Sequence, residues 1–166
     1  MTAEPGGMRR QDREILERRE LDELLHAAGV CRLALAWDDE PYLVPLSFGY
    51  DGRRLYFHTA LSGRKLDFVA HNPRVCFEVE EEPRVVEHPE RGCAWGVAYA
   101  SVIGYGRLVE LLDEAGRKQG LDEIMRHYSG RADWPYAPAV LARTRVWALE
   151  IESLTGKRAP GKPEED

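Results

Sequence analysis

The chain has 166 residues, of which 43% are hydrophobic and 31% are charged, and its formal net charge is −6. This length predicts a single domain that can fold without a disulfide framework or a structural metal. The acidic balance disfavours a protein that grips nucleic acid along a basic face, and no run of about 18 apolar residues predicts a membrane span.

The chain begins with a segment that has little to bury. Residues 1–8 contain two glycines and a proline, which predicts a disordered tail. An arm follows, and apolar residues at helical spacing then predict a helix over about Glu20–Ala28, ended by Gly29. The N-terminus lacks the apolar core of a secretory leader, and three widely spaced cysteines predict free thiols in the cytoplasm.

Two strands are predicted after the helix. Val30–Trp37 is an apolar run of strand length, and the acidic turn after it leads into a second strand, Tyr42–Tyr50. One face of the second strand is bulky, whereas the other carries smaller residues and leaves room for a flat ligand against the backbone. The smaller residues are Leu43, Pro45, Ser47 and Gly49. Because Pro45 cannot donate a ladder hydrogen bond, we expect this strand at a sheet edge or interrupted there.

The middle of the chain alternates strands with one short helix. Asp51-Gly52 is a hairpin signal, and the strand Arg54–Thr59 follows it. Lys65–Asn72 is predicted to be helical and to end before Pro73, because a residue that precedes proline avoids the helical region. Arg74–Glu80 predicts the next strand.

The last part contains the longest β-like stretch, Ala94–Leu112. Gly104 and Gly106 inside it predict a bulge or a close approach of backbone. A helix is predicted over Asp113–Tyr128, capped by its first residue, and a final strand over Arg145–Leu154, which Thr155-Gly156-Lys157 ends.

These elements predict the fold class. About six strands joined mostly by hairpins, with helices between or outside them, indicate a mainly β (α+β) fold, an antiparallel barrel with peripheral helices. The predicted domain spans residues 9–158, and residues 159–166 are predicted to be a second disordered tail.

The sharpest local feature is Ser62-Gly63-Arg64-Lys65, at the start of the predicted short helix. A helix N-terminus favours phosphate, Arg64 can bind phosphate with two parallel hydrogen bonds, and Lys65 supplies a point charge. The spacing is not that of a Walker A loop, so the same residues also fit a solvated basic turn.

His58 lies on the strand that leads into this loop. It could hydrogen-bond a ligand, transfer a proton near neutral pH or face solvent, and it is the candidate catalytic residue. The five histidines have no ligand spacing, so no metal site is predicted.

Read in order, these segments resemble the FMN-binding split-barrel proteins, the pyridoxamine 5′-phosphate oxidase-like superfamily, and within it the nitroimidazole-resistance (Nim-like) branch. The resemblance covers about residues 10–160. The segments that carry it are Pro41–Tyr50, Leu55–Ala60, Gly63–Lys65, Asn72–Phe77, Ser101–Gly106 and Thr155–Arg158.

The resemblance implies a six-stranded split barrel that forms a homodimer, with two FMN sites at the dimer interface. It implies that backbone groups of the second predicted strand line the flavin ring, namely those of Pro45, Leu46, Ser47 and Phe48. The residues implied beneath the ribityl chain and phosphate are His58, Thr59, Ala60, Gly63, Arg64 and Lys65. Trp95 and Ser101 are implied to come from the neighbouring subunit or the far rim, and Lys157 to approach the flavin edge.

Two departures from the family pattern bear on substrate. Nim-like proteins often carry histidine where this chain has Arg64, and the Arg-x-His of true pyridoxamine phosphate oxidases is absent. Vitamin B6 oxidation is therefore not expected. The sequence favours a small FMN-dependent oxidoreductase with a reduced nicotinamide donor and a small-molecule acceptor, a nitroaromatic being one candidate. Two alternatives stay open: a flavin-binding or sensing protein without turnover, and a split barrel that binds a deazaflavin or haem, with His58 or His127 as the haem ligand.

Overall fold

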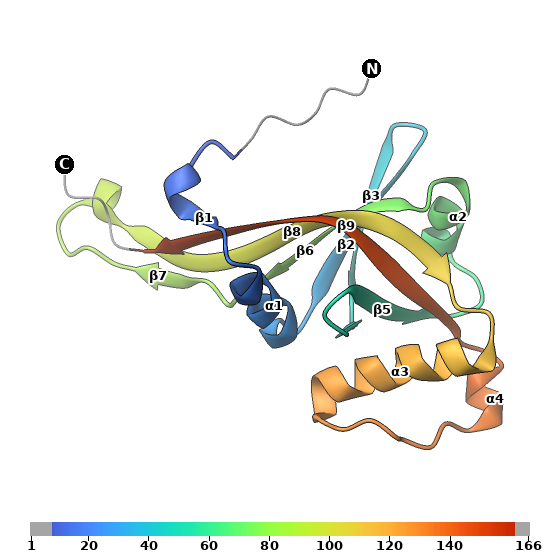
Figure 1. Cartoon of the computed structure of the whole chain (residues 1–166). Helices are drawn as coiled ribbons and strands as arrows, with labels where there is room; N and C mark the ends of the chain where they lie inside the picture. The colour runs from blue at the N-terminus through green and yellow to red at the C-terminus, as the bar shows by residue number, and fades with distance from the viewer. Residues whose placement is uncertain (1–7, 162–166) are drawn as a thin grey trace.

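The structure, a computed structural model, describes residues 8–161, in which nine antiparallel strands form one sheet flanked by helices (Figure 1). The predicted tails at 1–7 and 162–166 lie outside the described residues. The strands are β1 (Glu14–Ile15), β2 (Cys31–Trp37), β3 (Glu40–Leu46), β4 (Gly49–Tyr50), β5 (Arg54–Thr59), β6 (Arg74–Glu80), β7 (Arg84–Val86), β8 (Gly96–Glu110) and β9 (Arg145–Pro160). The helices are α1 (Arg18–Ala27), α2 (Arg64–His71), α3 (Glu114–Ser129) and α4 (Pro138–Leu141).

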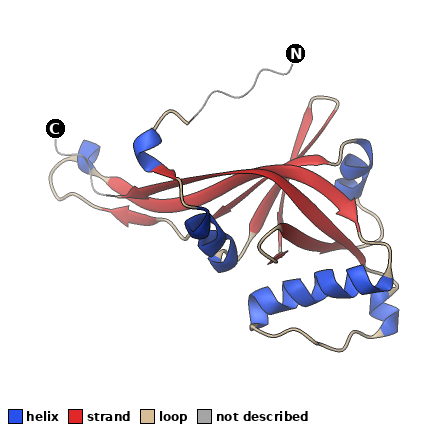
Figure 2. Ribbon diagram, in the orientation of Figure 1, coloured by secondary structure: helices blue, strands red, loops and turns tan. Residues whose placement is uncertain are grey.

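The sheet order confirms the predicted class of fold. The strands follow the order β3-β2-β6-β8-β9-β5-β4, with β1 pairing with β9 and β7 with β8. The six long strands are the predicted ones, and the three short strands β1, β4 and β7 bring the count to nine. In Figure 2 the strands form the central body, while the helices lie around its rim.

The predicted strand Tyr42–Tyr50 is two strands in the structure. β3 ends at Leu46 and pairs with β2, whereas β4 starts at Gly49 and pairs with β5. Ser47 and Phe48 connect them, because the chain here leaves one edge of the sheet for the other. β3 is an edge strand, as Pro45 predicts.

The final strand is longer than predicted, and the prediction of a tail from residue 159 was wrong. β9 continues through Thr155-Gly156-Lys157 to Pro160, paired with β8 as far as Ala98. Gly156 is buried within this stretch, where an added Cβ would lie 2.2 Å from a methyl carbon of Leu21. Gly156 was predicted to end the strand, but its lack of a side chain makes room for Leu21 of α1 to pack against β9.

The glycines of β8 behave as predicted. The β8–β9 register shifts between Tyr105 and Gly106, which marks an irregularity of the ladder. A Cβ on Gly106 would lie 2.2 Å from the carbonyl oxygen of Glu150. The two long strands thus bend across each other around a close backbone contact.

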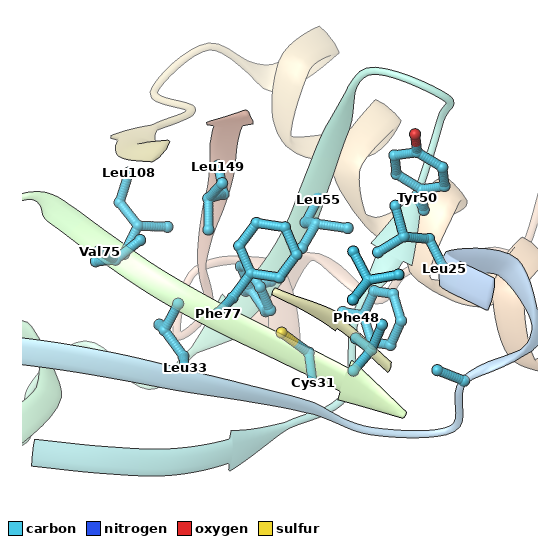
Figure 3. Packing of buried hydrophobic residues seen from close by; sticks show 14 of the residues in the cluster. Leu25, Cys31, Leu33, Phe48, Tyr50, Leu55, Val75, Phe77, Leu108 and Leu149 are labelled. Atoms are coloured by element: carbon cyan, nitrogen blue, oxygen red, sulfur yellow. The ribbon is translucent and has the colours of Figure 1, made fainter. Parts of the chain in front are cut away.

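The main core lies on the inner face of the sheet. In Figure 3 side chains from the strands of the sheet and from α1 gather in one cluster with Phe77, which is fully buried. Leu25 of α1, Leu33 of β2 and Leu149 of β9 are also at most 2% exposed. Burial of this kind contributes roughly 1.5–3 kcal/mol per large apolar side chain.

A second, smaller core joins α3 to the sheet. Asp113 caps α3 by accepting a hydrogen bond from the N–H of Gly116, as predicted. Ile124 packs against Tyr56 and Ala148 on the other face of β5 and β9. The short helix α4, which the sequence did not predict, follows the loop after α3.

The hairpin turn between β4 and β5 depends on Asp51. Its carboxylate accepts hydrogen bonds from the Tyr56 hydroxyl at 2.7 Å and from the N–H groups of Arg53 and Arg54 at 2.8 and 2.7 Å. Burial alone would raise the pKa of Asp51, but these three donors together bring it below its ordinary value.

We expect Asp51→Asn to lower the free energy of unfolding by about 1–2 kcal/mol at pH 7, because charge-assisted bonds are lost. A lowered pKa in the folded state stabilises the fold above the unfolded pKa of about 3.9, and this stabilisation disappears as the pH falls through the folded value. Urea unfolding at pH 7 and at pH 3 should therefore show the difference between the two proteins shrinking in acid. A difference that stays constant would contradict this role of Asp51.

The cysteines and the apolar character of the helices bear on two further predictions. All three cysteines are free, with Cys31 buried and Cys93 exposed. Within residues 8–161 no helix has both the length and the apolar character needed to cross a membrane.

Candidate functional site

The start of α2 has the geometry that the sequence predicts. Gly63 precedes the helix with φ of 144°, a conformation that favours glycine. Its carbonyl accepts hydrogen bonds from the N–H groups of Leu66 and Asp67. Arg64 and Lys65 begin the helix, where no earlier turn supplies carbonyl acceptors for their N–H groups. This helix end can therefore donate hydrogen bonds to an anion.

Arg64 and Lys65 point to different sides of the helix. Lys65 lines the mouth of the barrel with Thr59 and Trp147. The Arg64 guanidinium instead lies 3.2 Å from the Glu40 carboxylate and 4.9 Å from the centre of the Tyr42 ring. Only Lys65 thus faces the barrel, and Arg64 faces the β2–β3 hairpin.

The mouth of the barrel is lined mostly by apolar groups and is nearly filled. The Trp147 indole donates a hydrogen bond to the Thr59 hydroxyl at 3.2 Å, and this hydroxyl donates to the carbonyl of Ala60 at 2.9 Å. Arg145 of β9 pairs with Thr59 of β5, and its guanidinium makes a two-bond ion pair with Glu110. The cavity here has a volume of only about 10 Å³, so it has room for about one water molecule.

His58 lies on β5 next to this mouth but on the opposite face of the strand from Thr59. Burial lowers the pKa of His58, and the nearby Lys65 ammonium lowers it further. The side chain still reaches solvent, and the shift favours the neutral imidazole at neutral pH. A neutral imidazole can both donate and accept hydrogen bonds.

The stretch predicted to line a flat ligand, from Pro45 to Gly49, is only partly open. Pro45 and Ser47 are exposed and Leu46 is half-buried, but Phe48 is fully buried. The N–H of Phe48 donates a hydrogen bond to the Tyr128 hydroxyl at 3.1 Å, so α3 uses this donor. The expectation of open space at Gly49 was wrong, because a Cβ there would lie 2.4 Å from backbone of α3.

The outer face of the sheet gathers several of the predicted site residues. Four paired residues form one row across the sheet, from Pro45 of β3 through Arg32 of β2 and Glu78 of β6 to Ile103 of β8. Ser101 and Lys157 face each other across β8 and β9, two positions along the same face. The exposed hydrophobic side chains of this face include Leu43, Val97, Ile103 and Tyr105.

The predicted residues therefore fall into two groups within one chain. Trp95, Ser101 and Lys157 lie toward the end of the β8–β9 ribbon that is far from α2 in Figure 1. Leu108, which lines the mouth beside Lys65, comes seven positions after Ser101, and this corresponds to about 23 Å along a strand. Trp95 is half-exposed, and its indole donates a hydrogen bond to the carbonyl of His88 at 2.9 Å.

A cleft beside the start of α2 was not predicted from the sequence. Its volume is about 410 Å³, within the ~300–1,000 Å³ range of small-molecule sites. The residues that line it are Trp37, Asp38, Glu40, Arg64, Asp67 and Phe68. The β2–β3 turn and α2 meet here only through the fold, and no spacing in the sequence signals their contact.

The chain is similar to known proteins over most of its length. A family model described as pyridoxamine 5′-phosphate oxidase matches residues 17–158. A FAD-binding protein of Mesorhizobium loti is 32% identical and has a TM-score of 0.63, with 87% of this chain and 96% of that chain covered. A proposed 5-nitroimidazole antibiotic resistance protein of Bacteroides thetaiotaomicron is 25% identical, with a TM-score of 0.78 and coverage of 87% and 86%.

Two other matches show less, one because its sequence identity is low and the other because it covers only part of the chain. The flavocytochrome Anf3 of Azotobacter vinelandii has a TM-score of 0.80 at 20% identity, over 96% of this chain and 75% of that chain, which shows the shared fold. An uncharacterized protein of Rhizobium meliloti is 34% identical over 67 residues. That match spans 40% of this chain and less than half, 44%, of the relative.

Proposed function

The chain belongs to the pyridoxamine 5′-phosphate oxidase family, and from that premise we propose that it is a flavin-binding oxidoreductase. The observation that carries the proposal is the start of α2, where unpaired N–H groups and the Lys65 side chain lie beside Leu46, whose neighbours Pro45 and Ser47 are exposed. The FAD-binding relative from Mesorhizobium loti, 32% identical over nearly its whole length, supports a flavin as the ligand.

The residues at this site fit a riboflavin phosphate. The helix end and Lys65 would hold the phosphate, and a Cβ at Gly63 would meet no atom within 4 Å, so the backbone there is open to a ligand. The barrel interior cannot take the ring, because its cavity holds about one water molecule. The ring would then lie outside the barrel, against Pro45 and Ser47. FMN is the smallest flavin that uses all of these contacts.

A bound flavin supplies hydride and electron transfer, while the chain supplies binding, orientation and charge. Lys65 offers a positive charge at the phosphate end, and His58, whose pKa is lowered, offers a neutral imidazole nearby. His58 remains our candidate for proton handling. We propose a reduced nicotinamide as donor, and the nitroimidazole-resistance relative supports a nitroaromatic as one acceptor.

We propose further that two copies of the chain complete each site. The outer face of β8 exposes Ile103 and Tyr105, and a two-fold pairing of copies would cover this face. Such a pairing could bring Ser101 and Lys157 of one copy close to α2 of the other, which a single chain does not achieve. The free thiols support our placing of the protein in the cytoplasm.

The haem alternative gains no support from His127. Its Nε2 lies 2.8 Å from the carbonyl of Ala28, and its ring packs against Phe48 with 4.4 Å between ring centres. A histidine held in this way would have to leave the inner packing to ligate iron.

The visible spectrum of the purified protein tests the proposal. We expect flavin absorption bands, with the released flavin identified by mass, and bleaching of these bands when NADH or NADPH is added without oxygen. A flavin that never bleaches would contradict the oxidoreductase and leave a flavin-binding protein. A colourless protein that takes up neither FMN nor FAD would contradict flavin binding itself.

A further inference from the structure

The cleft between the β2–β3 turn and α2 shares Arg64 with the phosphate loop. Arg64 and Lys65 are consecutive residues in the first turn of α2, yet Lys65 lines the barrel mouth and Arg64 lines the cleft. A ligand that places a phosphate at this helix end could therefore extend to either side. The barrel side accepts the flavin in the proposed function, which leaves the cleft side unassigned.

The walls of the cleft have the chemistry of a nucleoside site. Trp37 and Phe68 form an edge-on aromatic pair with ring centres 5.9 Å apart, and both line the cleft. Phe68 is 4% exposed, so the half-buried Trp37 ring is the aromatic surface that a purine base would contact by stacking. His71 stacks on the Trp37 indole at 3.7 Å and fixes the orientation of that wall.

The charged side chains of the cleft further restrict the class of ligand that it can bind. Asp38, Glu40 and Asp67 supply carboxylates, which accept hydrogen bonds from ribose hydroxyls and from an exocyclic amine. The same carboxylates disfavour an additional phosphate on the ribose. The cation of the cleft, Arg64, sits at the side that adjoins the helix start, where a diphosphate would lie. Its guanidinium lies 3.2 Å from the Glu40 carboxylate, so a diphosphate would take the place of Glu40 as its partner.

We infer that this cleft is the subsite for the adenosine diphosphate part of a dinucleotide. The inference rests on the proposed flavin site, because the diphosphate is shared at the α2 start. Two dinucleotides carry this group: FAD, whose riboflavin half would occupy the barrel side, and NADH, which would bind as the donor. Both sources predict that substitutions of cleft residues other than Arg64 weaken binding of the dinucleotide and leave binding of FMN unchanged.

The test uses the full chain freed of flavin and titrated with FAD or FMN, with flavin fluorescence as the readout. We expect FAD to bind at least about tenfold more tightly than FMN, since stacking and ribose contacts are added. Trp37→Leu and Asp67→Ala should each lower the affinity for FAD about tenfold and leave that for FMN unchanged. Trp134→Leu changes the same residue type in a different cleft and should affect neither.

The outcomes separate this inference from the proposed function. If FAD and FMN bind equally, NADH binding to the FMN-loaded protein is measured, and a tenfold loss in both cleft variants assigns the cleft to the donor. Intact FMN binding with FAD and NADH unaffected by both variants overturns the inference alone. A protein that binds no flavin overturns the proposed function and this inference together. Asp67 is exposed on α2, so its variant keeps the test valid if Trp37→Leu does not fold.

Discussion

Replacing both Arg64 and Lys65 with alanine is expected to weaken FMN binding by at least about 100-fold. Each cation can contribute about 1.5–3 kcal/mol through a charge-assisted hydrogen bond to phosphate. Of the single variants, Lys65→Ala should have the larger effect, because Lys65 faces the barrel mouth while Arg64 is engaged by Glu40 and Tyr42. Titration of the flavin-free protein with FMN measures the change.

Riboflavin is the ligand control for this experiment, since it lacks the phosphate. Its affinity should be nearly the same in the double variant and in the natural protein. Arg19→Ala with Arg53→Ala removes the same charge from exposed positions on α1 and on the β4–β5 turn, and should leave FMN binding intact. If the double variant keeps its affinity for FMN, the phosphate does not bind at the start of α2.

Gly49→Ala is expected to lower the free energy of unfolding by about 3 kcal/mol or more. An added Cβ would lie 2.4–2.6 Å from backbone atoms of Glu123 and Ile124, and backbone of a helix cannot yield as a flexible side chain can. The variant should displace α3 from β4 and weaken the hydrogen bond from the Phe48 N–H to Tyr128. Flavin affinity should fall as well, because the packing of α3 holds the Pro45–Phe48 segment in place.

Gly29→Ala is the matched control, since a Cβ there meets no atom within 4 Å. Its free energy of unfolding in urea should stay within about 0.5 kcal/mol of the natural protein. An equal loss in both variants would mean that glycine at position 49 matters for chain flexibility rather than for the approach of α3.

Local patterns were sufficient to predict most of the fold. Alternation identified the long strands, Pro45 identified the edge strand, and Gly104 with Gly106 identified the irregularity in β8. The errors occur where a distant segment decides the local structure. Gly156 lies within a strand because Leu21 packs over it. The predicted strand Tyr42–Tyr50 is interrupted at Ser47–Phe48 because β3 and β4 pair with different strands.

The site was predicted less completely, for the same physical reason. The Gly63–Lys65 sequence predicts a helix end suited to phosphate, and the structure has that helix end. Sequence order does not reveal that Arg64 and Lys65 diverge, or that Trp37 comes to lie beside Arg64. It also does not reveal that Ser101 and Lys157 face each other across two strands far from α2.

Native mass spectrometry of the protein with added FMN tests the central claim most directly, because it counts chains and flavins in one complex. A flavin held at the start of α2 and completed by a second copy predicts a species of two chains and two flavins. The Lys65→Ala variant should keep the two chains and lose the flavins. A single chain that carries one flavin, or a pair of chains that takes up none, would contradict the account.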